Sequence, residues 1–215
     1  MLNRAITLAS FVLCCCALIA AAFSLSNELS YSRAQAITDV TTVDELKTTL
    51  EQLQKINFNH YLPYSQTREL EGELLMRISM LSPKIDEDQL NQAVLAFRSS
   101  IKNDPANGSL WGKLALSKAL LKQYDPEFDM AMQRVFEYSG WEFDSAETII
   151  KIGLANPQEL SVDSLLIVKE SVRRLYSANP FYTIYLARKM NQMHLACIWA
   201  RDITPANPWC LNELQ

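Results

Sequence analysis

The sequence predicts an all-α protein in which one hydrophobic N-terminal segment precedes a stack of antiparallel helix pairs. Apolar residues recur at helical spacing along most of the 215-residue chain. Capping residues and prolines interrupt that pattern at short intervals. The chain contains only five glycines, too few for the turns of a β-sandwich or barrel. These three observations point to helices joined by short turns.

The N-terminal segment is predicted to be a single-pass membrane anchor. No charge lies between Arg4 and Glu28. A helix over residues 5–26 is about 33 Å long at about 1.5 Å per residue, which spans a bilayer core. A cleaved signal peptide is the alternative, because residues 20–22 are three alanines. A lipoprotein is the weaker third reading, because Leu13 precedes the first cysteine.

The charge around this segment predicts its orientation. Arg4 and the amino terminus flank one side, and Glu28 is the first charge on the other. The positive-inside rule then leaves the N-terminus in the cytoplasm and the rest of the chain outside it. We therefore expect an anchor over residues 1–26, a linker over 27–40 and a helical domain over 41–215.

The helical domain divides at caps and prolines. Between them, apolar residues stand three or four positions apart, the spacing of one buried helix face. Helix starts and breaks are expected at Thr42 with Glu45, Pro83, Asp86 with Gln89, Asn103-Asp104-Pro105, Ser109, Asp125-Pro126, Asp144 with Glu147, Asn156-Pro157 and Asn179-Pro180. The last predicted helix runs unbroken to about Trp199.

One junction between helices has the spacing of a tetratricopeptide repeat. The small, aromatic, small and proline positions of that motif match Ala93, Phe97, Ser100 and Pro105. The Trp, Leu and small positions of the next repeat match Trp111, Leu114 and Ala115. The spacing predicts a tetratricopeptide-like stack with Phe97 and Trp111 in one core, and an irregular helical bundle is the alternative.

The run Asn-Gly-Ser-Leu-Trp-Gly-Lys-Leu-Ala at residues 107–115 resembles a hinge in membrane-anchored proteins of bacterial exopolysaccharide clusters, the VpsP type. There, a Trp-x-x-Leu-Ala helix precedes an Ala-rich helix ending near a Trp, then a helix with basic residues and a closing Asn-Pro or Asp-Pro. The counterparts here are Trp111 to Ala115, Ala131 to Trp141, and Val168 to Pro180, which includes Arg173 and Arg174. The resemblance covers about residues 90–190 plus the anchor.

This resemblance implies a role in making or exporting surface polysaccharide, such as exopolysaccharide or O-antigen. Together with the predicted anchor and its orientation, it predicts a bacterial inner-membrane protein with its helical domain in the periplasm. It implies as partner a membrane-embedded polysaccharide polymerase, ligase or export protein. It carries over no catalytic residue.

No residue pattern predicts catalysis, a cofactor or a metal site. The two histidines, His60 and His194, lack ligand neighbours at zinc spacing. Glu69, Glu71 and Glu73 alternate along a helix and are expected to form a solvated face. The net charge of -4 argues against a nucleic-acid partner. We therefore expect a protein without enzymatic activity.

Two sets of residues are candidates for other roles. Cys197 and Cys210 are the only cysteines beyond the N-terminal segment, and an oxidising compartment would let them form a disulfide. The candidate contacts to a partner or a glycan are Tyr64, Trp141, Arg173 and Arg174. The leading hypothesis is a helical scaffold that binds proteins. The alternative is a glycan-binding module that uses exposed aromatic and arginine side chains, and an enzyme of unknown chemistry comes third.

Overall fold

The computed structural model describes residues 42–55, 64–201 and 210, and every regular element in these ranges is a helix. The predicted all-α class is confirmed for this part of the chain. The helices are α2 (Val43–Lys55), α3 (Tyr64–Leu81), α4 (Glu87–Asn103), α5 (Gly108–Leu120), α6 (Pro126–Ser139), α7 (Phe143–Ala155), α8 (Val162–Ala178), α9 (Pro180–Lys189) and α10 (Met193–Ala200), with a 3₁₀ turn at Pro157–Glu159.

The predicted anchor over 1–26 and linker over 27–40 lie outside the described residues. Within the described ranges, every helix is too short or too polar to span a bilayer. The structure therefore leaves the anchor a prediction.

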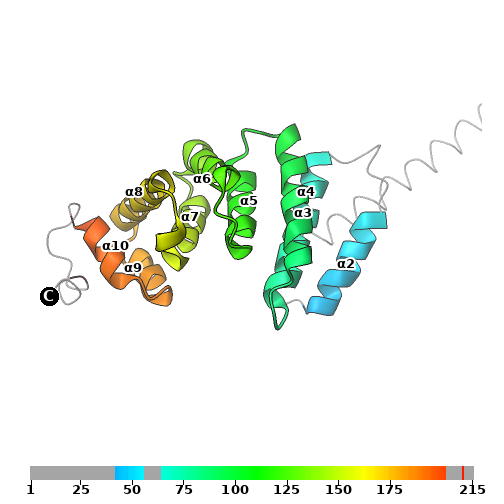
Figure 1. Ribbon diagram of the computed structural model, residues 1–215, viewed down its shortest axis with the longest axis horizontal. Helices are drawn as coiled ribbons and strands as arrows, with labels where there is room; N and C mark the ends of the chain where they lie inside the picture. The colour runs from blue at the N-terminus through cyan, green and yellow to red at the C-terminus, as the bar shows by residue number, and fades with distance from the viewer. Residues whose placement is uncertain (1–41, 56–63, 202–209, 211–215) are drawn as a thin grey trace, which may run out of the picture.

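The helices form an elongated row in which each one packs on its neighbours in sequence (Figure 1). The closest packing joins α3 to α4 and α5 to α6, and α7 packs on α8. Each helix pair has a first and a second helix. The first helices α5, α7 and α9 contact one another in turn along the row, and the second helices α6, α8 and α10 do the same. In Figure 1, α2 lies at one end and α9 and α10 lie at the other. The helices therefore form two rows, one of first helices and one of second helices.

Most of the predicted helix starts are confirmed by side-chain caps. Glu45 Oε2 accepts a hydrogen bond from the Thr42 backbone N–H at 2.9 Å, and Thr42 Oγ1 accepts one from the Glu45 N–H at 3.3 Å. Asp86, Asp125 and Asn179 each accept from the backbone N–H three residues further on. These caps satisfy N–H groups that lack partners inside their helices.

Two predicted caps are wrong. Helix α5 is capped by Asn107 and not by Ser109, since Asn107 Oδ1 accepts from the Leu110 N–H at 3.4 Å. Helix α7 begins before Asp144, and Glu142 occupies its cap position without a side-chain hydrogen bond. Asp144 therefore lies in the first turn, where its negative charge still favours the helix dipole.

The prediction of one unbroken helix to about Trp199 is wrong, because the chain turns between α9 and α10. Asn191 has a left-handed φ of 56°, and the Gln192 N–H donates to the Ala187 carbonyl at 2.8 Å. This Schellman arrangement ends a helix, and asparagine tolerates the left-handed region better than most residues. The same arrangement ends α5, where Lys122 has a φ of 58°.

One apolar core runs along the row, and Phe97 and Trp111 both belong to it as predicted. Phe97 is completely buried, and its ring fills the space over Gly72, where an added Cβ would lie 2.6 Å from Cε1. Trp111 packs against the core from its edge and is only half-buried. Its indole N–H donates to the Pro105 carbonyl at 2.8 Å.

A network of ion pairs around one buried lysine joins α4, α5 and α6. The Lys118 side chain is 1% exposed, and its Nζ donates to Asp125 at 2.8 Å and to Glu127 at 2.7 Å. Arg98 binds the same Glu127 carboxylate through two hydrogen bonds of 2.7 and 2.6 Å. The hydrogen bonds from Arg98, with those from Lys118, outweigh burial and lower the pKa of Glu127 to about 2. No sequence pattern predicts this network.

Cys197 and Cys210 form a disulfide in the structure, with their Cα atoms 5.4 Å apart. Both cysteines are buried with Tyr176 and Ile184 in a small second apolar cluster. The bond ties residue 210 to the end of the row formed by α8, α9 and α10. Because disulfides persist only in oxidising compartments, its state in the cell stays a prediction.

Candidate functional site

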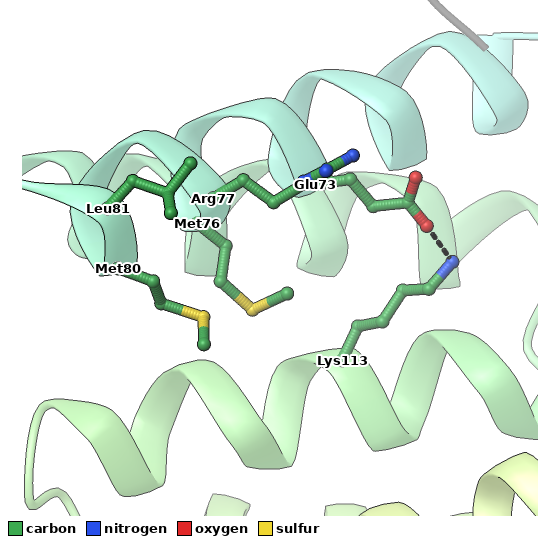
Figure 2. A pocket seen from close by; sticks show the side chains of 6 residues that line it. All are labelled: Glu73, Met76, Arg77, Met80, Leu81 and Lys113. Carbon is green, nitrogen blue, oxygen red and sulfur yellow. Dashed lines mark ion pairs between the residues drawn. The ribbon is translucent and has the colours of Figure 1, made fainter. Parts of the chain in front are cut away.

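The candidate site is a groove of about 470 Å³ between α3 and α5, hereafter the α3–α5 groove (Figure 2). It is lined by Glu73, Met76, Arg77, Met80, Leu81 and Lys113. The groove exists because α3 packs closely on α4 but touches α5 at few points. The flank of α3 that faces α5 is therefore uncovered toward its C-terminal end.

Methionine and leucine side chains give the groove an apolar wall. Met76 is buried, and its Sδ accepts a hydrogen bond from Ser117 Oγ at 3.5 Å. Met80 is 53% exposed, and Leu81 is exposed beside it. Methionine side chains are flexible and polarisable, so they adapt to apolar groups of different shapes. The wall suits an apolar side chain from another molecule.

Lys113 lies at one end of the groove, held by two carboxylates of α3. Its Nζ pairs with Glu69 at 2.5 Å and also with Glu73, as Figure 2 shows for the second pair. Burial disfavours the charged amine, but the two carboxylates outweigh it, and the pKa of Lys113 is raised. Lys113 is therefore held in its charged form, and the two carboxylates neutralise that charge.

The prediction that Glu69, Glu71 and Glu73 form a solvated face is wrong. Glu69 and Glu73 stand four residues apart, share one face of α3 and converge on Lys113. Glu71 lies on another side of the helix, where it accepts hydrogen bonds from Arg68 at 2.5 Å and from Gln54 at 3.2 Å. All three carboxylates therefore serve contacts between side chains.

Two of the four predicted contact residues come together away from this groove. Trp141 is 82% exposed, and the guanidinium carbon of Arg174 lies 4.2 Å from its ring centroid. The same carbon lies 4.2 Å from the Phe136 ring, so the guanidinium is held between two aromatic rings. Glu170 accepts a hydrogen bond from Arg174 Nε at 3.1 Å. Trp141 is thus presented to solvent on a fixed support.

The other two predicted contact residues do not join this stack. Arg173 is half-buried on α8. Tyr64 is the first residue of α3, but its side chain lies outside the described part, as does His60. Trp199 is buried, so it offers no surface for a sugar ring. Of the two aromatic candidates Tyr64 and Trp141, only the side chain of Trp141 lies in the described part of the chain, and its ring is accessible.

Within the described residues, no group of three histidine, cysteine, aspartate or glutamate side chains is arranged to hold a metal ion. His194 lies exposed on α10. Comparisons of the chain with protein-family models, curated proteins and solved structures found no match. The described geometry therefore carries the functional argument, which rests on grooves and exposed side chains.

Proposed function

We propose that this protein is a membrane-anchored helical scaffold that supports bacterial surface polysaccharide production by binding a partner protein in the α3–α5 groove. The supporting observation is the exposed methionine and leucine wall of that groove. Large apolar side chains that remain exposed in a groove mark interaction surfaces. The cluster of Lys113 with Glu69 and Glu73 makes one end of the groove polar, whereas the methionine and leucine side chains make the rest apolar.

A tetratricopeptide-like arrangement of the helix pairs is part of this proposal. The paired order of α3 with α4, α5 with α6, and α7 with α8 supports a tetratricopeptide-like stack, in which first helices line a binding surface. The role in polysaccharide production is supported by the resemblance at residues 107–115 to VpsP-type proteins. The partner is then a polysaccharide polymerase, ligase or export protein in the inner membrane, reached from the periplasm through an anchor over residues 5–26.

A pair of substitutions on adjacent surfaces tests the scaffold. Met80→Glu places a charge in the α3–α5 groove, whereas Ile85→Glu places one on an equally accessible residue outside it. In a deletion strain of the source bacterium, full-length Met80→Glu should fail to restore exopolysaccharide, and Ile85→Glu should restore it. Both variants should retain helical circular dichroism. Restoration by both variants would contradict binding in the groove.

The second candidate function, glycan binding, is favoured by the accessible Trp141 ring on Arg174. An exposed aromatic face stacks on a sugar ring, and an adjacent guanidinium binds a carboxylate. Acidic and neutral oligosaccharides should then change the tryptophan fluorescence of the full-length protein to different extents. The change should be lost in Trp141→Ala and kept in Tyr185→Ala, which removes another exposed aromatic ring. No change with either oligosaccharide would exclude this function.

A further inference from the structure

A second groove, of about 610 Å³, lies between α6 and α8 and is hereafter the α6–α8 groove. Its apolar floor is formed by Met130, Phe136, Leu166 and Ile167. Leu166 is 57% exposed, and Met130 is exposed opposite it. In Figure 1, α6 and α8 lie side by side along the upper edge of the row, with α7 below them. This apolar strip lies on the row of second helices.

The walls of the α6–α8 groove carry three carboxylates, those of Asp129, Glu137 and Asp163. Glu137 is paired with Arg134 at 2.8 Å, and no basic side chain from the described residues lines the groove itself. Asp129 is fixed in place, because the hydroxyls of Ser161 and Ser164 both donate to its Oδ1 at 2.7 Å. Neither Asp129 nor Asp163 has an ion-pair partner in the described part of the chain. An apolar floor between unpaired carboxylates is complementary to a cationic, amphipathic ligand.

The two ends of the groove differ in charge because α6 and α8 run parallel. The contact of Asp129 with Ser161 and Ser164 joins the beginnings of the two helices. The stacking of Arg174 on Phe136 joins their ends. The carboxylates without an ion-pair partner therefore lie where the helices begin, whereas the charges near their ends are paired, Glu137 with Arg134 at 2.8 Å and Arg174 with Glu170. A bound segment would place its basic residues toward the beginnings.

We propose that the α6–α8 groove binds an amphipathic helix of a partner protein, with apolar side chains on the floor and lysine or arginine beside Asp129 and Asp163. Binding of an amphipathic helix in an apolar groove is a recurring mode of recognition, and paired charges on its flanks set the orientation. Helix α6 has 14 residues, so the groove accommodates a helix of about 21 Å, or about four turns.

This site goes beyond the proposed binding in the α3–α5 groove. The two grooves share no lining residue, and they lie on different rows of helices. The protein would therefore hold two segments at once, one in each groove. A failure of binding in one groove would therefore leave the proposal for the other groove standing.

Fluorescence anisotropy of labelled 14-residue peptides with the full-length protein tests the α6–α8 groove. The probes are a leucine–lysine peptide with leucines at helical spacing, the same peptide with glutamates for lysines, and a leucine–lysine peptide of scrambled order. Only the first should bind saturably. Leu166→Ser should weaken that binding about tenfold. Val162→Ser, on the same helix but outside the groove, should change it less than about twofold.

Charge variants separate the groove from general attraction to an acidic protein. Asp163→Asn should weaken binding and reduce its dependence on salt, whereas Asp88→Asn, exposed at the start of α4, should do neither. Equal binding of the scrambled peptide would show attraction to net charge and overturn the proposal. Binding of the glutamate peptide, or no saturable binding of the basic peptide below about 1 mM, would also overturn it.

Discussion

Removing Glu127 and removing Lys118 from the ion-pair network of α4, α5 and α6 should have unequal effects on stability. Glu127→Gln takes away the carboxylate that both Arg98 and Lys118 bind, and leaves the buried Lys118 with Asp125 alone. Lys118→Met removes the buried charge itself. The carboxylates that remain reach solvent, with side-chain exposures of 46% for Asp125 and 28% for Glu127, and Arg98 still binds Glu127.

The magnitude follows from the shifted pKa of Glu127. A fall from 4.5 to about 2 sets an upper limit of about 3 kcal/mol of folding free energy at neutral pH, and solvent screening lowers this value because the side chains of Arg98 and Glu127 are 42% and 28% exposed. We expect Glu127→Gln to cost about 2 kcal/mol, below the range of about 3–5 kcal/mol for breaking a fully buried ion pair, because only Lys118 of this network is buried. Lys118→Met should cost about 1 kcal/mol, because methionine fills similar space and no buried charge is left unpaired.

Urea unfolding followed by circular dichroism measures the free energy of unfolding of both variants. The comparison requires the same slope of that free energy against urea concentration in each variant. Because the pKa of Glu127 is lower in the folded protein, its stabilisation is present above pH 4.5 and is lost as the pH falls toward 2. The gap between wild type and Glu127→Gln should therefore close over that interval. A gap that is unchanged from pH 7 to pH 3, or a larger loss for Lys118→Met, would refute the assignment of these roles.

Three further outcomes are expected. Alkylation of unreduced, denatured protein should leave Cys197 and Cys210 unmodified, with the closed loop contributing about 3 kcal/mol; label found on Cys197 and Cys210 by peptide mapping would exclude the bond. Gly153→Ala would place a Cβ 2.2 Å from Val168 Cγ2 and should cost about 2 kcal/mol in a urea melt. Val168→Ala should relieve that loss in the double variant, and strictly additive losses would contradict the clash. Trp111→Ala should cost about 2 kcal/mol, below the usual range for a buried aromatic because the ring is half-buried, and a loss above about 4 kcal/mol would place it deeper in the core.

The sequence determined the helical class of the described part and most of its helix starts. A cap is a local structure, because a side chain at Asp86, Asp125 or Asn179 reaches a backbone N–H only three residues away. The same locality explains the predicted breaks at Asn156-Pro157 and Asn179-Pro180, since proline restricts its own backbone and that of the preceding residue. The left-handed turn at Asn191 has a weaker local signal, and the sequence pattern alone did not predict it.

Only the tertiary structure decided which side chains meet. Lys113 reaches Glu69 across 44 positions, and Arg98 reaches Glu127 across 29. Trp141 and Arg174 were both candidates in the sequence, but their stacking, and the exposure of one Trp141 face, depend on how α6 packs on α8. Both grooves arise in the same way, from the spacing between helices that are not consecutive. Periodicity shows which face of a helix is buried, whereas the angle and distance between helices decide what lies across from that face.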